Sequence, residues 1–193
     1  MLLRDPVHGD IELNPAEVQI ADLAIVQRLR GIKQLGTAHL VYPGALHTRF
    51  DHSVGVCAVA HEIVTALRHS GLHVTEDLET AIAIAALLHD VTHVPFGHTL
   101  EDERRLFDRH DEGSRLAQLF SRELGHALER LGLREIVGHL LGLSSTESAP
   151  QWAKDIVSGC IDADLLDYLR RDSYFAGSYP NPAHRIAGQR WSR

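Results

Sequence analysis

Apolar residues recur every three or four positions along most of this chain, which is the spacing of helices that bury one face. Asn14 before Pro15, Thr48, and Thr75 before a run of acids are typical helix starts, because such residues satisfy the first backbone amides. The Ser70-Gly71 pair is a typical helix end. The pattern predicts an all-α fold with helices over residues 14–31, 48–71, 75–90, 111–131, 133–141, 152–158 and 161–174.

Turn-forming residues interrupt this helical pattern at both ends of the chain and within it. Asp5-Pro6 and Gly9-Asp10 predict a short hairpin or irregular arm over residues 1–13, and prolines after Gly177 predict an irregular tail over 178–193. We therefore expect one domain over residues 1–177, made of the arm and a helical core over 14–177. Two loops are also expected, at residues 35–46 and at the histidine-rich stretch 92–98.

Composition narrows the class of protein. With 44% hydrophobic and 23% charged residues, the chain has the balance of an ordinary globule rather than a disordered segment. A net charge of −7 argues against a long nucleic-acid partner. The longest apolar run, Ala81–Leu88, is too short to cross a membrane. Cys57 and Cys160 lie far apart without metal-type spacing, and no signal peptide is visible, so we expect a reducing cytoplasm.

The fourteen histidines are the unusual feature, because histidine is the commonest protein metal ligand. An apolar stretch ends abruptly in His89-Asp90, and burying such a pair is costly unless a divalent cation compensates. Arg49 and His52 are neighbours near the start of an earlier helix, and Asp164 opens a later one. Taken alone, each feature is better explained by simple capping or by a solvated acidic face than by a metal site.

The ordered set His52, His89-Asp90 and Asp164 resembles the H…HD…D pattern of the HD metal-dependent phosphohydrolase superfamily. Further stretches are similar to one branch, the SAM-and-HD-domain deoxynucleoside triphosphate triphosphohydrolases and their bacterial relatives. The likeness covers about residues 4–177 and implies an HD-domain helical bundle. The stretches that carry it are residues 5–13, 27–36, 43–56, 88–98 and 164–172.

The resemblance implies a function and roles for individual residues. The protein would hydrolyse a deoxynucleoside triphosphate (dNTP) to a deoxynucleoside and triphosphate, with one divalent ion (Mn, Fe, Zn, Co, Ni or Mg) held by His52, His89, Asp90 and Asp164. His93 would be the acid/base and Glu101 the acid that partners it. Residues implied to bind substrate are Arg49, His98 and His110 at the phosphates, Gln34 and Leu35 around the sugar, and Tyr168 and Asp172 at the deoxyribose.

Two features of the resemblance bear on regulation and substrate. Asp22, Gln27 and Arg30 match positions that grip an activating guanine nucleotide between subunits, which would imply a homodimer or homotetramer; an exposed polar helix face explains them equally well. Leu165 stands where many relatives carry a phosphate-binding lysine. This loss of charge leaves two alternatives open: a phosphohydrolase for nucleoside monophosphates or cyclic phosphodiesters, or a weakly active nucleotide-binding and sensing module.

Overall fold

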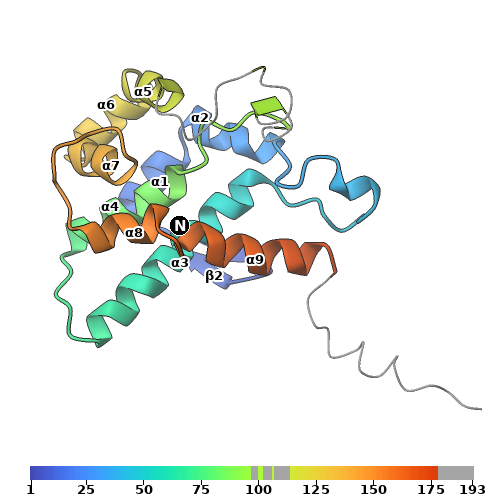
Figure 1. Cartoon of the computed structure of the whole chain (residues 1–193), viewed down its shortest axis with the longest axis horizontal. Coiled ribbons are helices and arrows are strands. Elements are labelled where there is room, and N and C mark those ends of the chain that lie inside the picture. The colour runs from blue at the N-terminus through green and yellow to red at the C-terminus, as the bar shows by residue number, and fades with distance from the viewer. Residues whose placement is uncertain (97–99, 102–105, 107–113, 178–193) are drawn as a thin grey trace, which may run out of the picture.

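The computed structural model describes residues 1–96, 100, 101, 106 and 114–177, and within them the chain forms a helical bundle with one small hairpin (Figure 1). The expected all-α fold with an N-terminal hairpin is confirmed. The expected tail at 178–193 lies outside the described residues. The helices are α1 Pro15–Ala21, α2 Ala24–Gln27, α3 Arg49–His69, α4 Glu76–Leu88, α5 Ser114–Phe120, α6 Glu123–Arg130, α7 Arg134–Leu140, α8 Gln151–Ser158 and α9 Ala163–Phe175, with 3-10 helices η1 Arg28–Gly31 and η2 Ala38–Leu40.

The N-terminal arm is a two-stranded antiparallel hairpin. Strand β1, Leu2–Asp5, pairs with β2, Gly9–Glu12, so that Asp5 lies opposite Gly9. The Asp5 carboxylate accepts hydrogen bonds from the backbone amides of Val7 and His8, both at 2.9 Å. These bonds fix the turn, and they direct the loop residues towards the helices behind the hairpin.

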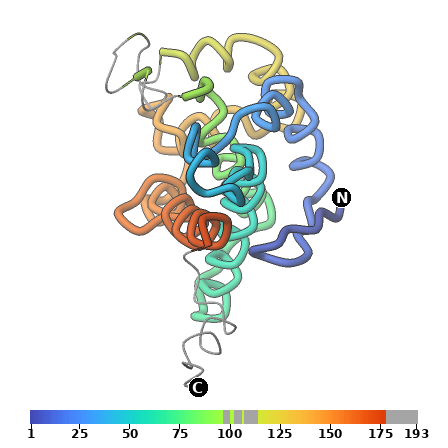
Figure 2. Tube along the Cα trace, turned by 90° about the vertical axis from the view of Figure 1, so that its right-hand side faces the viewer, coloured from blue at the N-terminus to red at the C-terminus, as the bar shows by residue number. Residues whose placement is uncertain are grey.

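The centre of the bundle is the antiparallel pair of α3 and α4. Every residue of Ala81–Leu88 in α4 is buried, as expected for a helix that is apolar on all sides. Helices α1, α7 and α8 pack on α4, while α9 packs on α3. Figure 2 shows the central pair between α1 on one side and α8 with α9 on the other.

Predicted caps are confirmed at the central helices. Thr48 accepts from the backbone amide of Asp51 at 3.3 Å, and the Asp51 carboxylate accepts from the Thr48 amide at 2.8 Å, which completes a capping box. Thr75 caps α4 through the amide of Leu78. α4 ends at Leu88, two residues earlier than expected.

Two of the predicted helices are wrong because each is broken in the structure. The helix expected over 14–31 ends at Ala21, and Leu23 adopts an extended conformation before α2 begins. With this break, Ile20, Ala21 and Val26 are all buried. The helix expected over 111–131 is divided into α5 and α6.

The break between α5 and α6 depends on a glycine. A side chain at Gly125 would collide with the carbonyl group of Phe120, so the two helices approach this closely only because that side chain is absent. The close turn lets Phe120 and Leu124 enter the same core. No described helix has the length and apolar character needed to cross a membrane.

Candidate metal and phosphate site

The predicted metal ligands come together from three helices. His52 lies in the first turns of α3, His89 follows the last residue of α4, and Asp164 lies in the first turn of α9. One donor atom from each of these three lies within 4.8 Å of the others. Asp90 carboxylate oxygens lie 3.9 Å from His52 Nε2 and 3.6 Å from His89 Nε2. The arrangement could hold one divalent cation.

Hydrogen bonds orient both imidazoles for such a cation. His89 Nδ1 donates to the carbonyl oxygen of Ala86 at 2.7 Å, and His52 Nδ1 donates to Asp167 at 2.7 Å. Each bond leaves Nε2 as the unprotonated nitrogen of a neutral ring. Both Nε2 atoms are buried, and His52 Nε2 faces the Asp164 carboxylate at 2.9 Å. The Nε2 atoms of His52 and His89 lie beside the carboxylates of Asp90 and Asp164, and this donor set fits a metal ion.

The negative charge of the carboxylates around His52 also favours a cation at this cluster. Burial alone would lower the pKa of His52, but the carboxylates of Asp164 and Asp167 outweigh it and raise the pKa to about 9. A proton on His52 therefore balances the carboxylates when no metal is bound. His52 Nε2 lies 2.9 Å from Asp164 Oδ1, where the positive charge is shared.

Asp90 links the cluster to the predicted catalytic histidine. Its carboxylate accepts from the buried guanidinium of Arg49 and lies 3.3 Å from His93 Nε2. Burial would raise the pKa of Asp90, but His89, His93 and Arg49 hold it well below its ordinary value. Because α4 ends at Leu88, His93 reaches the cluster through a turn rather than along a continued helix.

Glu101, the predicted partner of His93, is buried next to the same turn. Arg115 Nη1 donates to Glu101 at 3.0 Å, and Arg115 Nη2 donates to the carbonyl oxygen of Thr92. Arg115 therefore connects Glu101 to the residue that precedes His93. The predicted pocket histidines His98 and His110 lie outside the described residues.

Two of the predicted sugar residues are linked through His47. The Gln34 backbone amide donates to the His47 carbonyl oxygen at 3.1 Å, and His47 Nε2 lies 2.8 Å from Asp172. The Gln34 side-chain oxygen is buried without a hydrogen-bond partner in the described part of the chain. Leu35 and Tyr168 are both half-buried, and none of the four predicted sugar residues lines the cavity described next.

A cavity of about 360 Å³ opens beside the cluster. It is lined by His89, Asp90, Asp164 and, from α8, Lys154. Among the described residues no carboxylate pairs with the Lys154 ammonium group. Sequence reasoning missed this lysine, because nothing near it in the chain belongs to a recognisable motif.

Asp167 is the most important residue that sequence reasoning undervalued. It is fully buried and accepts from His52, from His8 at 2.6 Å, and from Arg171 at 2.8 and 3.0 Å. Arg171 also donates to Asp5 at 2.7 Å. His8 therefore contacts the side chain that orients His52. The four-residue spacing of Asp167 and Arg171 was the available signal.

The predicted regulatory residues lie on one short stretch away from this cavity. Gln27 Nε2 donates to the Ala21 carbonyl oxygen at 2.8 Å, and Arg30 Nε donates to Gln27 at 2.8 Å. The Arg30 guanidinium lies 3.6 Å above the Phe50 ring. Asp22 is the exposed C-cap of α1.

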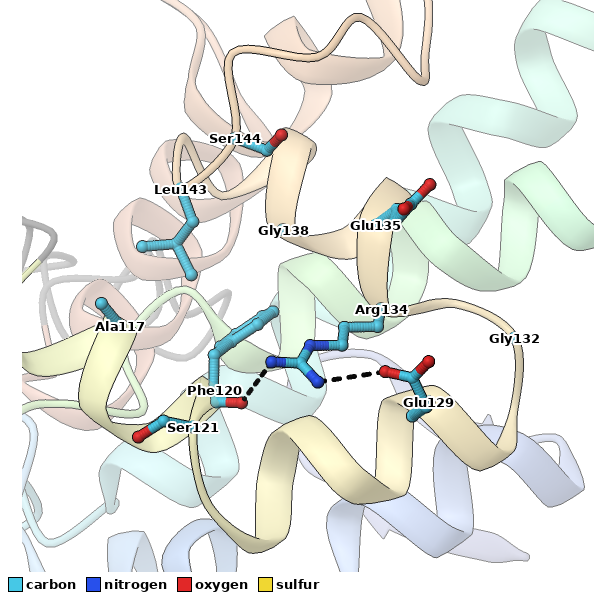
Figure 3. A pocket seen from close by; sticks show the side chains of 10 residues that line it. All are labelled: Ala117, Phe120, Ser121, Glu129, Gly132, Arg134, Glu135, Gly138, Leu143 and Ser144. Atoms are coloured by element: carbon cyan, nitrogen blue, oxygen red, sulfur yellow. Dashed lines mark hydrogen bonds and ion pairs between the residues drawn. The ribbon is translucent and has the colours of Figure 1, made fainter.

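A larger hollow of about 660 Å³ lies between α5, α6 and α7 (Figure 3). Its cation, Arg134, is already engaged by Glu129 at 3.0 Å and by the Phe120 carbonyl oxygen at 3.2 Å. None of the predicted site residues lines it. The smaller cavity at His89 is therefore the better candidate for chemistry.

The sequence also matches a known protein family. The family profile described as HD domain matches residues 49–172. An uncharacterised protein of Methanocaldococcus jannaschii is 36% identical over 181 residues, which are 92% of this chain and 34% of that protein. The deoxynucleoside triphosphate triphosphohydrolase SAMHD1 of Homo sapiens is 34% identical over 212 residues, 93% of this chain and 34% of that enzyme.

The fold is also similar to that of a solved structure. The crystal structure of a phosphohydrolase from Bacteroides thetaiotaomicron superposes with a TM-score of 0.80 at 34% identity, covering 94% of this chain and 44% of that one. The chain spans about a third of the length of the curated relatives described above.

Proposed function

This chain belongs to the HD domain family, and from that premise we propose that it is a metal-dependent phosphohydrolase that converts dNTPs to a deoxynucleoside and triphosphate. The observation that carries the proposal is the convergence of His52, His89 and Asp164, whose donor atoms lie within 4.8 Å of one another with both imidazole Nε2 atoms buried. Similarity to the human triphosphohydrolase supports the choice of substrate.

We propose His52, His89, Asp90 and Asp164 as ligands of one divalent cation. Such a cation supplies Lewis acidity towards water and phosphoryl oxygens. Asp167 fixes the His52 ring through Nδ1, and the Ala86 carbonyl oxygen fixes His89 in the same way.

Side chains of the protein then bind the phosphates and supply a proton to the leaving group. Water attacks the α-phosphorus and loses a proton to solvent, and the bond from that phosphorus to the 5′ oxygen breaks. His93 donates a proton to the departing 5′ oxygen and is reprotonated from solvent. Arg49 and Lys154 supply positive charge for the phosphate oxygens. Lys154 thereby compensates for Leu165, where relatives carry a lysine.

We propose that Gln34, Tyr168 and Asp172 select the sugar of the substrate. Gln34 presents an unpaired oxygen, and Asp172 is held by His47, whose ring stacks on Phe175 at 4.6 Å. Tyr168 would close the space that a 2′-hydroxyl needs. A ribonucleotide would therefore bind less well than its deoxy counterpart.

The test is a product analysis with purified protein, each dNTP and a panel of divalent ions. We expect equal amounts of deoxynucleoside and triphosphate, lost with chelator and lowered at least 100-fold in Asp90→Asn. Asp77→Asn, on the exposed first turn of α4, is the matched control and should retain full activity. Release of pyrophosphate or single phosphate would exclude the proposed cleavage.

A second candidate function is hydrolysis of nucleoside monophosphates or cyclic phosphodiesters. It is favoured by Leu165, because one cation fewer suits a substrate with fewer charges. Parallel assays on these substrates would identify it, whereas binding without any turnover would instead indicate a sensing module.

We also propose that the chain assembles as a homodimer or homotetramer with a regulatory nucleotide near Asp22, Gln27 and Arg30. Arg30 is an exposed residue, so an anionic ligand could reach it.

We propose a reducing cytoplasm as the location of the protein. Free thiols at Cys57 and Cys160 fit this proposal.

A further inference from the structure

A second group of metal-ligating side chains lies between α1, α3 and α4 and shares no residue with the HD site. Donor atoms of Glu17, Cys57 and His61 lie within 4.8 Å of one another. Cys57 and His61 are one turn apart on α3, so they project from the same face of the helix. Glu17 reaches them from α1, with its Oε1 2.8 Å from His61 Nε2.

We propose that Glu17, Cys57 and His61 bind a divalent metal ion, preferentially zinc. One thiolate, one imidazole and one carboxylate make a mixed sulfur, nitrogen and oxygen donor set, which zinc accepts and magnesium or calcium does not. The proposal is independent of the phosphohydrolase function.

Neighbouring groups already orient the three side chains. Glu79 lies 2.8 Å from His61 Nδ1, the carboxylate–histidine arrangement that directs Nε2 towards a metal. Asn14 holds both oxygens of Glu17, through its backbone amide at 2.9 Å and its side-chain amide at 2.8 Å. Glu17 and Cys57 are fully buried, so their geometry is fixed by the core.

Charge at this cluster also suits a divalent ion. The buried Glu17 carboxylate and the half-buried Glu79 carboxylate both contact His61, so two negative charges already surround this ligand. Zinc takes cysteine as the thiolate, so Cys57 would add a third negative charge for the ion to compensate.

The ion has a route to two of the three ligands, Glu17 and His61, behind which Cys57 is buried. A hollow of about 660 Å³ beside the hairpin is lined by Glu17, His61 and Asn14 among others. The His61 side chain is 28% exposed, which leaves that ligand accessible to an incoming ion. A water molecule from this hollow can complete the coordination, because three protein ligands leave a fourth position.

A bound ion would fasten α1 to the α3–α4 pair. The hairpin that precedes α1 carries Asp5 and His8, which hold Arg171 and Asp167 behind the HD site. The proposed role of the zinc is therefore to stabilise the fold around the catalytic cluster rather than to react.

Cobalt substitution tests the proposal directly. The whole chain is stripped with a chelator and titrated with Co²⁺, and thiolate-to-cobalt charge-transfer absorption is recorded. The HD site has no sulfur ligand, so only a cysteine site produces this band. Because the HD site also takes Co²⁺, the titration is done in Asp164→Asn, where we expect the band to saturate at one equivalent per chain. In the same background the band should be retained with Cys160→Ser, lost with Cys57→Ser, and formed with at least tenfold weaker Co²⁺ binding in His61→Gln.

Metal content separates this site from the HD site. Elemental analysis should find two bound ions in the wild-type chain, one in Cys57→Ser and one in Asp164→Asn, with Cys57→Ser still hydrolysing substrate. If Cys57→Ser does not fold, Glu17→Gln with the thiol intact takes its place and should also bind at least tenfold more weakly. Absence of the charge-transfer band at every Co²⁺ ratio, or its survival in Cys57→Ser, would overturn the proposal.

Discussion

At the scale of single residues, the proposed function depends on positive charge in the HD cavity to bind the substrate phosphates. Lys154 lines the cavity with Asp164, and Leu165 contributes none of the charge that relatives place there. We expect Lys154→Ala to reduce kcat/KM for triphosphates about 10- to 100-fold, since a charge-assisted hydrogen bond contributes about 1.5–3 kcal/mol. Steady-state kinetics would measure this loss.

Two further variants show whether that loss is local. Lys154→Arg keeps the charge and should recover most of the activity, while Arg130→Ala removes an exposed charge from α6 and should change nothing. Unaltered kinetics in Lys154→Ala would remove this lysine from the phosphate site.

Asp5 gives a residue-scale prediction about pH. Burial would raise its pKa, but Arg171 outweighs burial, so the folded-state pKa lies below the ordinary value of 3.8. The stabilisation is therefore present above pH 3.8 and is lost as pH falls through the folded-state pKa. Asp5→Asn should cost about 1.5–3 kcal/mol at pH 7, and its difference from wild type should narrow below pH 3.8.

Urea unfolding of both proteins across this pH range checks the Asp5 prediction. Asp10→Asn is the matched control, because the Asp10–Arg4 pair in the same hairpin is exposed to solvent, which screens its charges. A stability gap that stays constant to pH 3 would contradict the assigned role of the Asp5 carboxylate.

Some site residues could be predicted from the sequence and others could not. The difference lies in whether a residue belongs to a sequence motif or is recognised only by a contact with a distant part of the chain. His52, His89, Asp90 and Asp164 could be predicted because each belongs to a motif readable from its neighbours in the chain. His8 and Asp167 could not be paired, because 159 residues separate them and only the folded bundle brings them to 2.6 Å.

At the scale of elements, the approach of α9 to α3 depends on Gly55. Alanine at a helical glycine usually stabilises by about 1 kcal/mol, but a Cβ here would overlap the Asp167 carboxylate and the Arg171 guanidinium. Overpacking costs about 1–3 kcal/mol, so we expect Gly55→Ala to destabilise and to weaken metal binding at His52. Thermal unfolding and metal titration measure both effects.

Gly138 in α7 is the control for this prediction. A Cβ there would meet only the Phe120 ring at 3.6 Å, which is ordinary contact. Gly138→Ala should leave stability unchanged or raise it by up to about 1 kcal/mol. If Gly55→Ala were equally well tolerated, the close approach of α3 and α9 would not depend on this glycine.

Element boundaries were predictable where a side chain caps the helix and unpredictable where packing breaks it. Thr48 and Thr75 are local signals, and both begin helices as expected. The extended residue Leu23 has no such signal, because the residues on both sides of it fit one helical pattern. Its conformation follows from burying Ile20 and Val26 together.

At the scale of the whole molecule, the HD site joins helices that are distant in sequence, so an ion there should stabilise the entire fold. Ligands come from α3, the end of α4 and α9, and unfolding separates all of them. An ion at 100 times its Kd stabilises the native state by about 2.7 kcal/mol. For a chain of this size, that corresponds to a rise in Tm of about 5–11 °C.

Mn²⁺ is the suitable probe for this prediction, because it prefers oxygen and imidazole donors and binds poorly where a thiolate is required. Adding Mn²⁺ to chelator-treated protein should raise Tm in the wild type and equally in Cys57→Ser. Asp164→Asn should lose most of the rise while unfolding at a similar temperature without metal, because this carboxylate is partly exposed. An equal Mn²⁺ response in all three proteins would show that the ion stabilises the chain from somewhere other than the HD cluster.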